Sequence, residues 1–210
     1  MLDLLWLPVV AYLLGSVSGS LWLGRLRGVD IRRLGSGNAG GTNALRTQGW
    51  RFALGVVLID IGKGLLVVWL ALRFAPESLR HALVWTSLLA AMAGHIWPLF
   101  HGFRGGKGAA TLVGGLLLAW PLALLAVLVT WLLVLSASGY VGVATVLAGF
   151  ALLPMAAWGE VSIERWAFAF SAALLLLYTH RGNLQRLRAG SEHRFERARL
   201  WHRLWQRWRA

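Results

Sequence analysis

The sequence predicts an all-α membrane protein, a polytopic helical bundle with about seven transmembrane helices. Of its 210 residues, 58% are hydrophobic and only 14% are charged, which is more apolar surface than a soluble core of this size can bury. The thirteen Trp residues fit the two interfaces of a membrane. The chain has no Cys, which excludes disulfides, thiolate metal sites and a cysteine nucleophile.

Apolar segments of helical length follow one another along the chain. The fourth and fifth share a run that exceeds the about 20 residues one span needs, and Pro121 divides it. The first segment has no basic residues before it, so we expect a retained helix and no cleaved signal peptide. The predicted crossings cover residues 4–23, 52–74, 81–100, 109–120, 121–136, 141–158 and 166–178.

The distribution of Arg predicts the topology. Arg residues concentrate in the loop 24–51 and in the tail beyond residue 179, and an excess of basic residues marks cytoplasmic loops. Seven crossings then place the N-terminus outside and the C-terminus in the cytoplasm. The loops 24–51, 101–108 and 136–140 share the cytoplasmic face with the tail.

No internal repeat is visible, so we expect one domain over residues 1–210. Its tail, about residues 184–210, alternates Arg with Leu and Trp, and the last ten residues predict a basic amphipathic helix on anionic lipid. The net charge of +13 is therefore assigned to lipid contact and topology. No nucleic-acid partner is expected.

Two glycine-rich polar segments are candidate phosphate sites. In residues 94–111, the amides of Gly105, Gly106 and Gly108 can converge on an anion beside the charge of Arg104 and Lys107. The pattern is not a nucleotide P-loop, because position 101 is His and Gly follows Lys107. A basic loop that only marks topology is the alternative. The earlier segment, 35–46, offers Ser36, Asn38, Thr42, Asn43 and Arg46 for an oxyanion or polyol, with a flexible linker as its alternative.

The predicted second crossing contains two ionisable residues one helical turn apart. Asp60 and Lys63 can neutralise each other on one helix face. Charges inside a membrane are costly and are often functional. The sequence leaves open whether this pair is functional or a structural anchor.

Several motifs occur together in one order along the chain: Ser36-Gly37-Asn38, Gly41-Thr42-Asn43, Arg46, Asp60-x-x-Lys63-Gly64, Gly94-His95, Gly105-Gly106-Lys107-Gly108, His180-Arg181-x-Asn183-x-x-Arg186-Leu187 and Gly190-x-Glu192. Together they resemble the PlsY family of bacterial acyl-phosphate:glycerol-3-phosphate acyltransferases. The resemblance covers nearly the whole chain, and it implies transfer of a fatty acyl group from acyl phosphate to the 1-hydroxyl of glycerol 3-phosphate. The products are lysophosphatidate and phosphate, and no cofactor or metal is expected.

This resemblance also assigns roles and a location. The expected partners are acyl phosphate, glycerol 3-phosphate and membrane lipids, at a site facing the cytoplasm in the bacterial inner membrane. The expected catalytic residues are His180, Asn183, Ser36 and Lys107, with His180 or the substrate phosphate as general base. The expected substrate-binding residues are Ser36, Asn38, Thr42, Asn43, Arg46, His95, Arg104, Gly105, Gly106, Lys107, Gly108, Thr111 and Arg181.

One segment departs from the family pattern. Residues 138–142 are Ser-Gly-Tyr-Val-Gly, where many members have Thr/Ser-Arg-Tyr-Val-Ser, so an Arg and a Ser are missing. A small transporter of a phosphorylated solute is the competing hypothesis, since it also needs basic glycine-rich sites. Such transporters usually show internal repeats, which this chain lacks.

Overall fold

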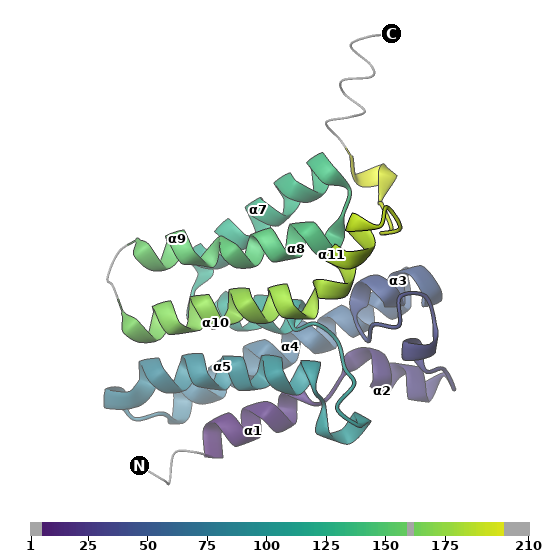
Figure 1. Cartoon of the computed structure of the whole chain (residues 1–210). Helices are drawn as coiled ribbons and strands as arrows, with labels where there is room; N and C mark the ends of the chain where they lie inside the picture. Colours follow the sequence, from purple (N-terminus) through teal and green to yellow (C-terminus); the bar gives the residue numbers. More distant parts are fainter. Residues whose placement is uncertain (1–5, 159–161, 200–210) are drawn as a thin grey trace. The chain divides into compact units, whose positions relative to one another are not determined.

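The computed structural model describes residues 6–158 and 162–199, and these form helices joined by loops, without strands (Figure 1). The predicted all-α class is confirmed. The chain divides into two compact units, Met1–Pro121 and Leu122–Ala210. The single-domain organisation and the orientation of the termini stay predictions.

Unit 1 is built around α4 (Trp50–Phe74), a helix of 25 residues. This helix packs against α1, α2, α3, α5 and α6. The α-helices around it are α1 (Trp6–Gly15), α2 (Gly19–Leu26), α3 (Gly41–Gln48), α5 (Arg80–Ile96) and α6 (Ala109–Ala119), and the short 3-10 helices are η2 (Ile31–Arg33), η3 (Glu77–Leu79) and η4 (Leu99–His101).

Glycines set the close contacts between the helices of unit 1. A Cβ built on Gly64 of α4 or on Gly114 of α6 would overlap the backbone of the facing helix. The same holds for Gly15 of α1 and Gly94 of α5. Small residues that let backbones approach are typical of helix packing in membranes. They fix α6 and α5, and therefore the loop between them, relative to α4 and α1.

Unit 2 contains α7 (Pro121–Ser138), α8 (Val141–Phe150), α9 (Leu152–Ala157), α10 (Ile163–Thr179), α11 (Arg181–Arg188) and η5 (Glu196–Ala198). The helix α10 packs against α8 and α9, and α11 against α8. Its core is formed by side chains of α10 that are at most 1% exposed, including Phe168, Ala172 and Leu176.

Each of the seven predicted crossings contains helix within the part of the chain that the structure describes. By length and composition, α4, the stretch Glu77–His101 and α7 can each cross a membrane. The helices α1 and α2 meet the same criteria only as a pair, which is bent by 46° at a break. The other crossings correspond to the shorter helices α6, α8 with α9, and α10.

Two expectations need correction. The first crossing was expected to be continuous, but it breaks between Gly15 and Gly19 because the ends of both half-helices find partners on α4. The segment 24–51 was expected to be a loop, but it contains η2 and α3. The amphipathic helix predicted for the last ten residues lies outside the described residues.

Candidate active site

The first polar segment folds around the side chain of Asn43. This amide is 1% exposed, and its Oδ1 accepts a hydrogen bond from the Ser36 N–H at 2.9 Å. Its Nδ2 donates to the carbonyl oxygens of Ile31, Leu34 and Asn38 over 2.9–3.2 Å. Asn43 was expected to contact substrate, but both polar atoms of its side chain bond backbone groups of residues 31–38 instead. It shapes the segment on which the exposed Ser36 lies.

The helix after this segment, α3, carries Thr42 and Arg46. They are four residues apart and so lie on one helix face. Thr42 is half-buried and Arg46 is exposed. The N-terminal end of a helix also favours anions, so α3 can contribute a hydroxyl, a guanidinium and its dipole to phosphate binding.

The second polar segment includes the glycine–lysine loop, residues 102–108. The expected convergence of its amides on an anion is contradicted for two of three glycines. Gly105 N–H donates to the Ile96 carbonyl, and Gly106 N–H to the His95 carbonyl, both at 3.0 Å. Of these three glycines, only Gly108 has a positive φ, 86°, where it precedes α6. The candidate anion-binding group of the loop is then the half-buried side chain of Lys107.

Gly105 and Gly106 are needed for close packing instead. A Cβ on Gly105 would overlap the His95 carbonyl oxygen, and one on Gly106 would overlap His95 Nε2. The Gly106 Cβ position also lies 2.7 Å from the Ala39 carbonyl oxygen. The two polar segments that the sequence singled out therefore meet, backbone to backbone, at Ala39 and Gly106.

Asp60 and Lys63 of α4 close the break between α1 and α2. Lys63 Nζ donates to the carbonyls of Gly15 and Val17 at 2.9 Å each, and Asp60 Oδ1 accepts from Gly19 N–H at 3.2 Å. Asp60 and Lys63 also form an ion pair of 3.0 Å. The ammonium thus caps the carbonyl end of α1 and the carboxylate the amide end of α2, as the helix dipoles favour.

The same ammonium reaches His95 of α5. Its Nζ lies 2.7 Å from His95 Nδ1, and because an ammonium can only donate, Nδ1 is the acceptor in this contact. His95 is 3% exposed. It was expected to bind substrate, but it lies buried beneath the glycine–lysine loop and supports Gly106. Thr111 was also expected to bind substrate, but it is fully buried where α6 contacts α4. The backbone of Thr111 lies against Gly64, which has no side chain to keep the two helices apart.

Arg104 is exposed, and its carbonyl is held by Arg32, a residue that the sequence reasoning did not single out. Arg32 forms an ion pair with Asp30 at 2.9 Å and donates to the His101 carbonyl at 2.9 Å. Hydrogen bonds from Arg32 lower the pKa of Asp30 to about 2. In the sequence, the role of Arg32 could have been found from the run Asp30-Ile31-Arg32, which places an acid beside a base next to a glycine-rich segment.

In unit 2, His180 follows α10 and is 4% exposed. Its Nδ1 lies 2.8 Å from the Leu176 carbonyl oxygen. Since a carbonyl only accepts, Nδ1 carries the proton, and in the neutral ring Nε2 has the lone pair. This tautomer suits a general base. Arg181 is exposed, and it stacks on Tyr178 with its guanidinium carbon 4.1 Å from the ring centroid.

Asn183 lies on α11, one turn after His180. Its Nδ2 donates to Glu192 Oε1 at 2.7 Å, and Arg186 Nε donates to Glu192 Oε2, also at 2.7 Å. The Glu192 side chain is 6% exposed. The sequence reasoning noted Glu192 without a role; the structure shows that it orients the amide of Asn183.

The turn that departs from the family pattern packs on these elements. A Cβ on Gly142 would lie 2.8 Å from the Asn183 Cβ. Gly139 has φ of 77°, and Arg194 from the tail donates to the neighbouring Ser138 carbonyl at 3.0 Å. Arg194 also lies over the Tyr140 ring at 5.2 Å. A tail guanidinium therefore lies at the turn that lacks its own Arg.

Comparisons with known proteins identify relatives that match most of the chain. A family model described as glycerol-3-phosphate acyltransferase matches residues 5–190. Glycerol-3-phosphate acyltransferases of Synechococcus sp. and Chlorobium luteolum are 42% and 36% identical, and each match covers 92% of this chain. The matches cover 96% and 97% of those relatives.

Two solved structures have the same fold. A crystal structure of PlsY, an integral membrane glycerol 3-phosphate acyltransferase, in its glycerol 3-phosphate form matches with a TM-score of 0.85 and 33% identity, over 92% of this chain and 96% of that one. The lysophosphatidic acid form of PlsY matches with a TM-score of 0.84 and 31% identity, over 95% and 99% of the two chains.

Proposed function

The chain belongs to the glycerol-3-phosphate acyltransferase family, and we propose that it uses acyl phosphate to make lysophosphatidate from glycerol 3-phosphate. It is a membrane enzyme that acylates glycerol 3-phosphate. The transporter alternative has no support among its relatives. We propose two further points: that the donor is acyl phosphate, and that individual residues have the roles described below.

The reaction joins two phosphate-bearing substrates. The 1-hydroxyl oxygen of glycerol 3-phosphate attacks the acyl carbonyl carbon and forms the new ester bond. The bond from that carbon to the phosphate oxygen breaks, and inorganic phosphate leaves with the electron pair. The hydroxyl proton passes to a base. An acyl phosphate is already activated, so no enzyme nucleophile is needed.

One observation carries the proposal for substrate binding: the contact of the Ala39 carbonyl with Gly106. It joins the segment of Ser36 and Arg46 to the loop of Lys107. Two phosphates side by side need two sets of cationic and hydroxyl groups. Arg46 with Ser36, Asn38 and Thr42 is proposed to hold one phosphate, and Lys107 with Arg104 the other.

His180 and Asn183 are proposed to act on the hydroxyl and the developing oxyanion. The Nε2 lone pair of His180 can accept the hydroxyl proton directly or position a substrate phosphate that accepts it. Asn183, oriented by Glu192, can donate to a negative oxygen. Arg181 is proposed to contribute charge for substrate binding.

The enzyme is proposed to lie in the bacterial inner membrane with its site facing the cytoplasm. The Arg content of loop 24–51 and of the tail supports this orientation. Single Cys substitutions at Gly40, Arg104, Ser138 and Gly190 test it in this chain without Cys. An impermeant thiol reagent should label all four only from the cytoplasmic side, and labelling of any one from outside would contradict the proposal.

The donor is tested with purified protein in micelles. We expect lysophosphatidate from acyl phosphate and glycerol 3-phosphate without nucleotide or metal, and no product when acyl-CoA replaces acyl phosphate. Strict dependence on acyl-CoA would refute the donor. Uptake of glycerol 3-phosphate by protein-containing liposomes, measured in parallel, tests the transporter alternative.

A further inference from the structure

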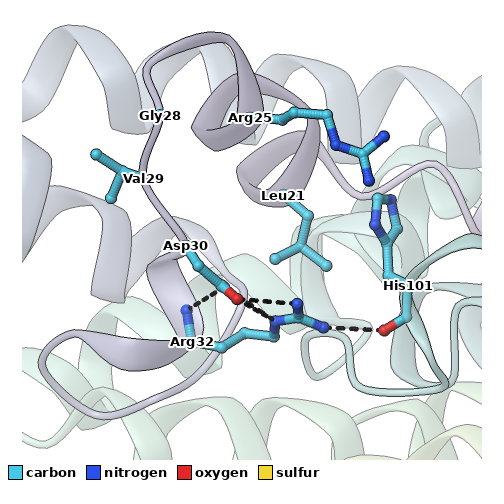
Figure 2. Close-up of a pocket in the computed structure, with 7 residues that line it drawn as sticks. All are labelled: Leu21, Arg25, Gly28, Val29, Asp30, Arg32 and His101. Atoms are coloured by element: carbon cyan, nitrogen blue, oxygen red, sulfur yellow. Dashed lines mark hydrogen bonds and ion pairs between the residues drawn. The ribbon is translucent and has the colours of Figure 1, made fainter.

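Unit 1 contains a cavity of about 310 Å³ between α2, the loop after it and η4 (Figure 2). None of the residues assigned above to substrate binding lines it. Ligand pockets span roughly 300–1,000 Å³, so this one suits a small group and is too small for an acyl chain. Its lining residues are Leu21, Arg25, Gly28, Val29, Asp30, Arg32 and His101.

One wall of the cavity is fixed by Arg32. Its guanidinium donates to both carboxylate oxygens of Asp30 and to the carbonyls of His101 and Arg104. These bonds tie the loop after α2 to the segment after η4. The single acid of the cavity is consequently paired with Arg32, and the wall is rigid before any ligand arrives.

Arg25 supplies the unneutralised charge. It is exposed, and its side chain makes no hydrogen bond or ion pair with the part of the chain that the structure describes. Its guanidinium points toward the half-buried imidazole of His101 (Figure 2). A neutral imidazole has one N–H group, so Arg25 and His101 can both donate to an oxygen atom placed between them. An oxyanion fits this arrangement, since Arg binds phosphate oxygens in a bidentate manner.

The surroundings of the cavity are apolar and exposed. Trp22 and Leu26 of α2 are 52% and 73% exposed, and Phe100 and Phe103 are 56% and 54% exposed. Exposed aromatic side chains next to cationic ones are typical of the membrane interface, where lipid phosphates lie. We propose that this cavity binds a phosphate headgroup through Arg25 and His101, separately from the catalytic reaction.

The test compares Arg25→Gln and His101→Ala with Arg33→Gln, a control that removes an exposed charge from the same segment outside the cavity. Short-chain phosphatidate is titrated into the full chain in neutral-detergent micelles, and the unfolding midpoint gives an apparent Kd. Inorganic phosphate is titrated in a second arm. Loss of a charge-assisted bidentate contact should weaken binding about tenfold or more.

We expect Arg25→Gln to raise the Kd for phosphatidate about tenfold, His101→Ala to raise it less, and Arg33→Gln to match the wild type. If only inorganic phosphate depends on Arg25, the site takes a soluble phosphate instead of a lipid. Equal Kd values for Arg25→Gln and Arg33→Gln in both arms would overturn the proposal. Turnover at saturating substrate should be unchanged in all three variants. The binding measurement uses no acyl donor, so it can fail or succeed independently of the proposed acyl phosphate reaction.

Discussion

Nε2 of His95 lies directly against the backbone of Gly106, which leaves no room for a side chain at position 106. On the other edge of the imidazole, Nδ1 lies 2.7 Å from the Lys63 ammonium. The glycine–lysine loop thus packs on His95, and His95 contacts the buried pair of Lys63 and Asp60 that caps α1 and α2 at the break in the first span. This contact links three regions that are far apart in the sequence.

Gly106→Ala should lower kcat/KM at least about tenfold, because the methyl group must displace His95 or the loop that carries Lys107. The matched control is Gly62→Ala, whose Cβ meets open space and should leave activity unchanged. His95→Ala removes the overlapping ring, so His95→Ala with Gly106→Ala should be more active than Gly106→Ala alone. If the double variant is no better, the overlap with His95 is not the cause, and the overlap with the Ala39 carbonyl oxygen accounts for the loss instead.

Lys63→Met should reduce the free energy of unfolding by about 3–5 kcal/mol, because it leaves the buried carboxylate of Asp60 without the ammonium that forms its ion pair. Asp60→Asn in the same chain should restore part of that loss. Glu77→Gln breaks an ion pair of the same spacing whose carboxylate is 87% exposed, and it should cost less than about 1 kcal/mol. Thermal unfolding in micelles measures all of these, and equal losses from the buried and exposed pairs would contradict the capping role.

Lys107→Ala and Arg46→Ala should each raise the KM for at least one substrate and also slow turnover. Each removes a charge proposed to hold phosphate in both the ground state and the transition state. Steady-state kinetics with each substrate varied separately will show which phosphate each residue holds. An unchanged KM for both substrates in either variant would argue against phosphate binding by that residue.

His180→Ala should lower kcat with comparatively little change in KM, since its proposed partner is the attacking hydroxyl. The residual rate should also vary less between pH 6 and 8, where histidines commonly titrate. If a substrate phosphate is the base, His180→Gln should keep most activity and the wild-type pH profile. Near-wild-type turnover of His180→Ala would exclude the residue from the mechanism.

Asp30→Asn should flatten the acid side of the stability profile. The pKa of Asp30 is lowered to about 2 by hydrogen bonds from Arg32, so the ionised carboxylate stabilises the fold above about pH 4, and this contribution is lost as pH falls toward 2. The unfolding midpoint of the variant should consequently fall less between pH 5 and pH 2.5. On an Arg32→Gln background, Asp30→Asn should have a smaller effect, because only the hydrogen bond from the backbone N–H of residue 32 remains; an effect of full size there would assign the shift to another group.

The sequence by itself determined the class of the protein and the segments that carry its chemistry. Composition and apolar run length indicate membrane helices because burial of each helix in lipid is a local property of about 20 residues. The motifs around Ser36, Lys107 and His180 identified the family because residue type and spacing within a motif are also local properties of the sequence. Helix α3 was missed because Gly and polar residues dominate residues 35–43.

Only the tertiary structure decided what several of those residues do. Asn43, His95 and Thr111 look like site residues in the sequence, yet all three are buried, and Asn43 and His95 form hydrogen bonds with neighbouring segments. Lys63 caps a carbonyl 48 positions away, and Gly106 is required by a histidine on another helix. Such roles depend on which backbone groups lack partners after folding, and that is fixed by contacts between distant segments, which local sequence patterns do not encode.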